Sequence, residues 1–426
     1  MKKFKKKINI LLFSSISTTP FLVALSMNIK ENNSLLDSEI KKIKSLIPEA
    51  ENVIFHKEIQ DIKNKKLLLI VFDNYYSVLD IDSNITIEIN NTKVPIHLVN
   101  MNIIYGGFLG ILTVNENKYF DVNNIEVSYD DIEKAYITID KNREKPSNNI
   151  KIRKKRSNDT NNNYPYINYD YNGVFKVSTT VPYSWWFASR DNKEKSGYVD
   201  LSFDITHSGE KGLCEYVALS QLMLYNEIFI KSGIFSKEKF DFYTKDSGHD
   251  KILENSSPVF RYHLYNKPES SLAMTLFNNA GRKLNLKTGK LYETAIKKFI
   301  NNNDEINKWN FNHKYGGYKK TWEYVKKGVP TILGVAPIEG FWPNHAYIMY
   351  GYDDKTDMFL GSMAWGQKRT NSVLYSYYTS AWGSYYFNIE LKNKKDLGKV
   401  NSVFKFYDTY FTGKTIDNFI KSRTSW

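Results

Sequence analysis

Apolar residues in the N-terminal third of the chain first follow a helical spacing and then form short extended runs. The apolar positions between Asp37 and Ile47 repeat every three or four residues and stop before Pro48, which predicts a helix. Five extended apolar runs follow, separated by turn residues such as Asp73-Asn74. The expected strands are Lys66–Phe72, Ile85–Ile89, Val94–Val99, Phe108–Val114 and Ala135–Ile139. We therefore expect residues 34–145 to form a small α+β domain, a helix packed on an antiparallel meander.

The pattern changes abruptly after this block. Residues 146–164 are polar and charged without apolar periodicity, which is typical of a linker, because such a segment buries too little surface to offset its ordering entropy. Its basic core, Lys151 to Arg156, is what a trypsin-like protease cuts, although a solvated tether explains it equally well. Residues 165–426 form a second, larger block that is rich in Tyr and Trp. The sequence thus predicts two domains joined by a linker.

Residues 1–26 carry a separate pattern. Lysines between Lys2 and Lys7 precede an apolar stretch from Ile8 to Ser26 that ends in small residues, an order typical of a cleaved secretory signal. The alternative is an uncleaved membrane anchor, because a stretch of about 19 residues just spans a bilayer. Several hydroxyl residues and Pro20 make it a weak span. We therefore expect a bacterial protein that is exported and is secreted or stays at the cell surface.

Composition and charge narrow the class of protein. The chain has 426 residues, 42% hydrophobic and 15% aromatic, which excludes collagen-like, coiled-coil and wholly disordered chains. A single cysteine excludes an internal disulfide framework and a zinc site built on several thiolates. The net charge of +13 comes almost wholly from the N-terminal lysines and from the stretch between Lys141 and Arg156. The body of the chain is nearly neutral, so we do not expect it to bind nucleic acid.

The single cysteine, Cys214, lies where a nucleophile is expected. Gly209 and Gly212 precede it and indicate a loop, and apolar residues from Val217 to Phe229 follow at helical spacing. Cys214 is therefore expected in the first turn of a helix. There the unpaired backbone amides and the helix dipole lower the pKa of a thiol, and the same amides receive an oxyanion. A packing role is the alternative, since free cysteines are among the most buried residues.

A thiolate nucleophile needs a base, and His345 is the best placed of the seven histidines. It opens an aromatic and aliphatic run to Tyr352 that predicts a core strand, and a preceding strand from Thr331 to Ala336 is expected to pair with it antiparallel. The backbone of a histidine at the first position of such a strand is fixed, with its ring at the edge of the sheet. His207, seven residues before the cysteine, is a weaker candidate for the base. A purely structural role for His345 at the strand end is the alternative.

The order of these motifs resembles a known family. Gly-Leu-Cys214 opens a helix, His345-Ala opens a strand, and Ser-Met-Ala-Trp365-Gly366 follows. This order of motifs resembles that of the papain-like cysteine peptidases. The chain resembles in particular the cysteine peptidases of mycoplasmas and their relatives, and it is more distantly similar to streptopain. The resemblance covers roughly residues 180–390 and implies a helix carrying the cysteine packed on an antiparallel sheet carrying the histidine. It also implies an N-terminal pro-region of a zymogen, which suits residues 34–145, and an accessory domain is the alternative for this block.

Two positions depart from the pattern of this family. Papain-like enzymes orient the imidazole with an Asn or Asp just before a Trp-Gly, and Ser362 or Met363 stands there in this chain, depending on the alignment. We expect the Ser362 hydroxyl to be the orienting group. The usual oxyanion glutamine before the cysteine is also missing, and Ser208 occupies its place.

The sequence therefore predicts an exported cysteine peptidase of the α+β class that acts on protein or peptide substrates. Cys214 is the expected nucleophile, His345 the base and later the acid, and Ser362 the orienting residue. No phosphate-loop, dinucleotide-binding or HExxH motif occurs, so no cofactor or metal is expected. Contact with a membrane is expected only if the N-terminal segment stays uncleaved. Two alternatives are open: a surface binding protein on a degenerate peptidase fold, and a papain-like amidase or acyltransferase that uses the same dyad.

Overall fold

The structure is a computed structural model. It describes residues 34–48, 50, 52–143, 175–181, 184, 187, 213–245, 259–260, 271–283, 289–316, 321–335, 345–363, 372–383, 385–393, 395, 404–406 and 409–411. The signal segment at 1–26 and the linker at 146–164 lie outside the described residues, as do Gly209, Gly212, His207, Ser208 and the Trp365-Gly366 pair. Within the described part of the chain, no helix has both the length and the apolarity that crossing a membrane requires.

The chain divides into two compact units, residues 1–42 and 43–426. In the first unit residues 34–42 are helical, and Lys42 Nζ pairs with Glu39 Oε2 at 2.9 Å. In the second unit residues 43–46 are helical, with Ile43 and Ile47 fully buried. The helix expected between Asp37 and Ile47 is confirmed.

A mixed sheet runs through the second unit. Its strands are β1 (Val53–Asp61), β2 (Lys66–Phe72), β3 (Tyr76–Asp80), β4 (Ile85–Asn90), β5 (Asn102–Tyr105), β6 (Ile111–Asn115), β7 (Lys118–Phe120), β8 (Glu126–Val127), β9 (Thr179–Thr180), β12 (Trp309–Tyr315), β13 (Thr331–Val335), β14 (His345–Asp353), β15 (Met358–Ser362), β16 (Ser372–Ser376) and β17 (Tyr385–Leu391). In the described residues their order is β12-β17-β13-β14-β15-β16-β4-β3-β2-β1-β5-β6-β7-β8, with β9 paired to β14. Neighbours are antiparallel except β1 and β5, which pair in parallel at their C-terminal ends. The α+β class is thus confirmed.

The remaining described elements are helices and two strand pairs. The helices are α2 (Tyr129–Lys134), α5 (Cys214–Tyr225), α6 (Lys237–Tyr243), α7 (Leu272–Asn279), α8 (Lys290–Ile300), α9 (Asn303–Ile306) and α10 (Thr321–Lys326). Short 3-10 helices are η1 (Ile96–Asn100), η2 (Gly107–Leu109) and η8 (Ser380–Trp382), and η4 (Asn226–Ile230) is a π-helix that continues α5. The pairs are β10 (Thr244–Lys245) with β11 (Val259–Phe260), and β18 (Phe404–Phe406) with β19 (Thr409–Phe411).

Of the five strands expected in the N-terminal block, two are present as predicted, one is present in part and two are absent. The expected strands at Lys66–Phe72 and Ile85–Ile89 are β2 and β4, and the antiparallel pair of β13 with β14 is confirmed. The strand predicted at Val94–Val99 was wrong, because Pro95 lacks an N–H for pairing with a neighbouring strand and the helix η1 follows it. Ala135–Ile139 was also wrong, because Ala135 ends helix α2. The expected strand at Phe108–Val114 begins only at Ile111 and is preceded by η2.

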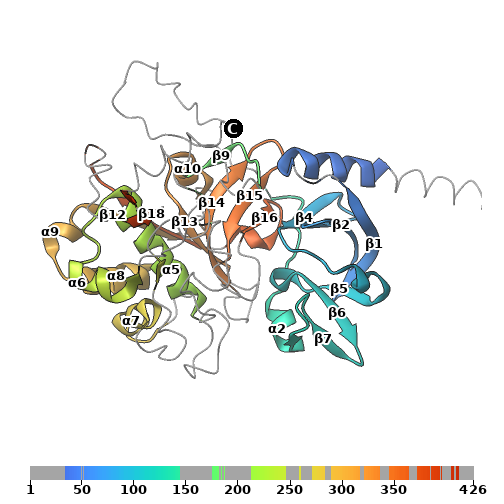
Figure 1. The fold of residues 1–426 in the computed structure, drawn as a ribbon, viewed down its shortest axis with the longest axis horizontal. Helices are drawn as coiled ribbons and strands as arrows, with labels where there is room; N and C mark the ends of the chain where they lie inside the picture. Colours follow the sequence, from blue (N-terminus) through green and yellow to red (C-terminus); the bar gives the residue numbers. More distant parts are fainter. Residues whose placement is uncertain are drawn as a thin grey trace, which may run out of the picture. The chain divides into compact units, whose positions relative to one another are not determined.

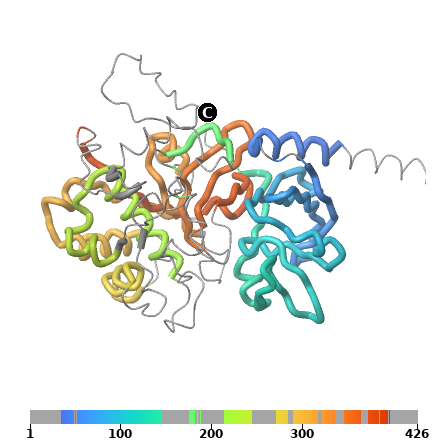
Figure 2. Tube along the Cα trace, in the orientation of Figure 1, coloured from blue at the N-terminus to red at the C-terminus, as the bar shows by residue number. Residues whose placement is uncertain are grey.

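One strand contact joins segments that are far apart in the sequence. Strand β16 pairs with β4, so that Val373 lies opposite Asn90 and Tyr375 opposite Glu88. The orange strands β14 to β16 therefore continue into the blue and cyan strands of the N-terminal block (Figure 1), and the same adjacency is visible in the tube view (Figure 2). Strands from both expected blocks thus share one sheet, although the predicted linker at residues 146–164 separates the blocks in the sequence.

Helix α5 lies on one face of this sheet. It packs on β14, β13 and β17, and helix α7 packs against α5 and α8 (Figure 1). All of its twelve residues are buried, which explains why its apolar pattern has no polar stripe. The ring of Phe187 stacks on both Tyr225 of α5 and Tyr350 of β14, at centroid distances of 4.9 and 5.3 Å. This packing fixes the helix that begins at Cys214 over the strand that begins at His345.

Candidate active site

Cys214 is the first residue of α5, as the sequence predicts. Leu213 stands at the N-cap position and offers no side-chain cap, while its carbonyl accepts the N–H groups of Tyr216 and Val217. The N–H groups of Cys214 and Glu215 precede these first bonds of the helix, so the helix itself does not use them. They are thereby available to the cysteine side chain.

Three backbone N–H groups lie close enough to the Cys214 sulfur to lower the pKa of its thiol. Those of Cys214 and Glu215 come from the helix, and that of Ala346 comes from β14. All three favour a negative charge on sulfur. Burial of the thiol, which is 8% exposed, acts in the opposite direction together with the adjacent Glu215 carboxylate, and the pKa of Cys214 rises from 9.0 to about 12. The expected lowering of this pKa is therefore wrong for this conformation, because desolvation and a like charge outweigh the amides.

His345 opens β14 and is 2% exposed. Its Nε2 lies 2.9 Å from the carbonyl oxygen of Met363. A carbonyl oxygen only accepts, so Nε2 carries the proton and Nδ1 is the basic nitrogen of the neutral ring. Since Ala346 follows His345 directly and its N–H lies close to the Cys214 sulfur, the structure brings the expected nucleophile to the strand position next to the expected base.

Ser362, the expected orienting residue, does not bond the His345 ring in this structure. It ends β15 opposite Ile348, and its Oγ is buried with no hydrogen-bond partner among the described residues. The acceptor for the ring is instead the backbone carbonyl of the next residue, Met363. A backbone acceptor leaves no trace in the sequence, because every residue has one.

An aromatic residue of the N-terminal block packs against His345. The ring of Phe108, in η2, lies 6.1 Å from the His345 ring and 5.6 Å edge-on from the ring of Tyr375, and it is 2% exposed. Its N–H donates to the Ala135 carbonyl at 2.8 Å. Gly107 makes this approach possible, since a Cβ there would lie 1.9 Å from that carbonyl oxygen. No motif in the sequence pointed to Phe108, because its contact partners are more than 200 positions away.

Glu215 is a further functional candidate that the motif search missed. Its carboxylate is 2% exposed, and the Tyr385 hydroxyl donates to Oε1 at 2.9 Å. The Tyr292 hydroxyl lies 3.2 Å from that of Tyr385. The signal that could have identified it is the presence of one charged residue, directly after the cysteine, in an otherwise uncharged helix.

The other predicted or possible sites lie elsewhere. His313 lies on β12, at one end of the strand order, and its Nε2 hydrogen-bonds Glu293 at 3.0 Å. His56 and His97 belong to the N-terminal block. His249 and His263 lie outside the described residues. No cluster of three or more His, Cys, Asp or Glu within the described ranges is arranged to hold a metal ion.

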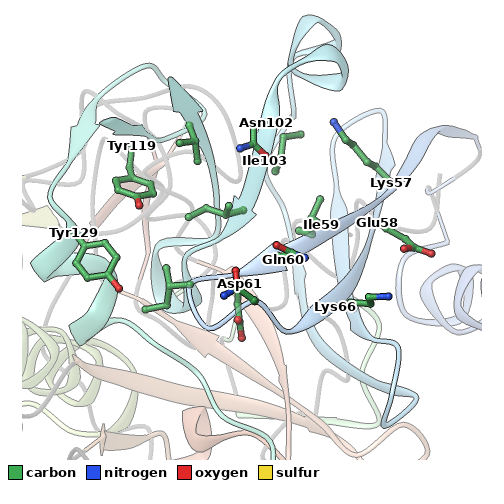
Figure 3. Close-up of a pocket in the computed structure, with 14 residues that line it drawn as sticks. Lys57, Glu58, Ile59, Gln60, Asp61, Lys66, Asn102, Ile103, Tyr119 and Tyr129 are labelled. Atoms are coloured by element: carbon green, nitrogen blue, oxygen red, sulfur yellow. The ribbon is translucent and has the colours of Figure 1, made fainter. Parts of the chain in front are cut away.

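A pocket of about 480 Å³ lies on the part of the sheet formed by β1 and β5 to β7 (Figure 3). Lys57 and Gln60 of β1 line one side, and Tyr119 and Tyr129 line the other. None of its lining residues belongs to α5 or β14. It is therefore separate from the site around Cys214.

No protein-family model matches the chain, and no curated protein matches it significantly in sequence. The function has to be argued from the site itself.

Proposed function

We propose that this chain is a cysteine peptidase and that the described conformation is its latent form. The observation that carries the proposal is the set of three backbone N–H groups on the Cys214 sulfur, one of them from the residue that follows His345. Such groups stabilise a thiolate or the oxyanion of a tetrahedral intermediate. The papain-like fold and the export of the protein are parts of the proposal that are supported by the sequence resemblance and by the N-terminal pattern.

The proposed reaction follows from these groups. The Cys214 sulfur attacks a peptide carbonyl carbon while its proton passes to His345 Nδ1, and the carbonyl electron pair moves to oxygen, where the N–H groups of Cys214 and Glu215 receive it. The imidazolium then protonates the amine as the C–N bond breaks. Water, deprotonated by His345, hydrolyses the resulting thioester and restores the thiol. The Met363 carbonyl holds Nε2–H and so fixes the tautomer that this sequence of steps needs.

The latent state follows from burial. Cys214 and His345 are 8% and 2% exposed, and Phe108 packs against the imidazole. An extended peptide needs both reacting groups accessible from one side. We infer that residues 34–145 act as a pro-region and that displacement of the segment carrying Phe108 opens the site, with the basic stretch from Lys151 to Arg156 as the proposed cleavage point.

The test compares the full chain before and after limited trypsin cleavage, with a quenched fluorescent peptide library as substrate. We expect hydrolysis only after cleavage, and we expect Cys214→Ala and His345→Ala to abolish it. His56→Ala, an exposed histidine on β1, is the matched control and should leave the rate unchanged. Hydrolysis that survives in the Cys214→Ala variant would refute the proposal.

A binding protein on the same scaffold is the second candidate. The observation that favours it is the burial of Cys214, which raises the thiol pKa to about 12 and makes the thiol unreactive near neutral pH. If the cleaved chain hydrolyses no peptide and Cys214 resists iodoacetamide at pH 8, the binding protein is the better account. An amidase or acyltransferase would show alkylation that depends on His345 together with turnover of non-peptide acyl donors.

A further inference from the structure

A buried hydrogen-bond chain ends beside the Cys214 sulfur. Tyr385 uses its proton to donate to Glu215 Oε1 at 2.9 Å, so at the 3.2 Å contact between the two tyrosines Tyr292 is the donor. The chain therefore runs from Tyr292 on α8 through Tyr385 on β17 to Glu215 on α5. All three side chains are at most 2% exposed, so the Glu215 carboxylate is held in the interior with the Tyr385 hydroxyl as its donor.

A glycine in the sheet leaves room for the tyrosine ring in the middle of this hydrogen-bond chain. Gly334 of β13 lies opposite both Tyr385 of β17 and Ala346 of β14. A Cβ at Gly334 would lie 1.8 Å from Cζ of the Tyr385 ring, so the ring lies directly on the glycine backbone. The first turn of α5 is thus fastened to the two strands that flank β13, to β14 by the Ala346 N–H at the Cys214 sulfur and to β17 by the Tyr385 hydroxyl at the Glu215 carboxylate.

We propose that Glu215, held by Tyr385 and Tyr292, is a positioning residue that fixes Cys214 over β14 and keeps a negative charge beside the sulfur. The consequence, which rests on the proposed peptidase function, is that Cys214 attacks its substrate from the thiol form. The S–H proton leaves for His345 Nδ1 while the S–C bond forms, and no thiolate–imidazolium pair is present beforehand. The carboxylate disfavours a thiolate and at the same time favours the imidazolium that appears during attack.

The groups that face the sulfur agree with this assignment. Glu215 is the carboxylate on its own helix, Tyr385 and Tyr292 face it from β17 and α8, and His345 belongs to β14. Burial raises the pKa of both tyrosines well above 10, so they stay neutral donors throughout the working range. Burial is the largest cause of the raised pKa of the Cys214 thiol, and Glu215 is the charged side chain that raises it further.

The test measures the rate of iodoacetamide alkylation of Cys214 in the full chain from pH 6 to 10, by mass spectrometry. Glu215→Gln keeps the shape and the acceptor for Tyr385 but removes the charge, and we expect alkylation at pH 8 to be about tenfold faster or more. Tyr385→Phe keeps the charge and removes its donor, so the rate should not rise. Glu238→Gln, which neutralises an exposed acid on α6, is the matched control and should leave the rate unchanged.

Comparing Glu215→Gln with Tyr385→Phe distinguishes the proposed charge effect from a general loosening of the fold. A looser helix would expose the thiol and accelerate alkylation in both Glu215→Gln and Tyr385→Phe, and that result overturns the proposal, as does an unchanged rate in Glu215→Gln. If Glu215→Gln does not fold, the pH profile of the unmodified chain tests the proposal. Its alkylation rate should still be rising at pH 10, and a rate that reaches a plateau below pH 8 overturns the proposal. The readout is independent of hydrolysis, so a chain that cleaves no peptide but shows the Glu215 effect refutes only the peptidase proposal.

Discussion

Replacing Glu88 with Gln tests how the two blocks of the chain are held together. Glu88 lies on β4, opposite Tyr375 of β16, and it is fully buried. Tyr76 and Asn90 donate to its Oε1 at 2.6 and 2.8 Å, Tyr105 donates to Oε2 at 2.8 Å, and Tyr375 donates as well. Burial nevertheless raises the pKa of this carboxyl above its ordinary value of 4.5, because desolvation outweighs the four donors.

The sign of the pH effect follows from this shift. A carboxyl whose pKa is raised in the folded state binds its proton more tightly there than in the unfolded chain. Its contribution to stability is fully present below the unfolded pKa and is lost as the pH rises through the folded pKa. Each unit of elevation corresponds to about 1.4 kcal/mol. The wild-type chain should therefore lose stability relative to Glu88→Gln as the pH rises above 4.5.

The magnitude at acid pH comes from the hydrogen bonds. At acid pH the protonated Glu88 carboxyl already presents one O–H donor, whereas the NH₂ group of Gln brings two donors to a site where Tyr76, Asn90 and Tyr105 themselves donate. Mismatching one buried hydrogen bond costs about 1–3 kcal/mol. Glu88→Gln should thus be less stable than wild type by about 2 kcal/mol at pH 4.5, and the gap should shrink or reverse at pH 8.

Urea unfolding of the full chain at several pH values measures this gap. Glu126→Gln is the control within the same block, since Glu126 is 57% exposed and pairs with the exposed Lys118. It should change the free energy of unfolding by about 0.5 kcal/mol or less at every pH. The difference in the free energy of unfolding between wild type and Glu88→Gln should therefore depend on pH. If it stays constant, or widens as the pH rises, the raised pKa of Glu88 does not govern the stability of the β4–β16 contact.

Three further changes probe the site and its packing. Ser362→Ala should leave the hydrolysis rate of the cleaved chain within about twofold, because the Met363 carbonyl holds the imidazole; a tenfold loss in the same assay would restore Ser362 as the orienting residue. Gly334→Ala should lower the free energy of unfolding by about 3 kcal/mol in urea titrations, because its Cβ would displace Tyr385, and an unchanged midpoint would contradict that close contact. Tyr347→Phe should raise stability by about 1 kcal/mol, since its buried hydroxyl has no partner among the described residues, and a lowered melting temperature would show an unrecognised partner.

The sequence alone was sufficient for the local parts of the candidate site. The apolar periodicity after Cys214 placed this residue in the first turn of a helix, where it lies, and the β13–β14 pair was predicted with its direction. These features depend on neighbours within a few positions, which the sequence displays directly. Where the local signal was weak, as around Pro95 and Ala135, a short apolar run fitted a strand or a turn equally well, and the strand predictions failed.

Only the tertiary structure decided the environment of those residues. The pairing of β4 with β16, the contact of Phe108 with His345 and the Met363 carbonyl as acceptor all join segments that no local pattern relates. The direction of the Cys214 pKa shift belongs to the same group. The helix start is written in the sequence and favours a thiolate, but burial depends on what covers the sulfur, and the desolvation that follows from it is a property of the folded chain.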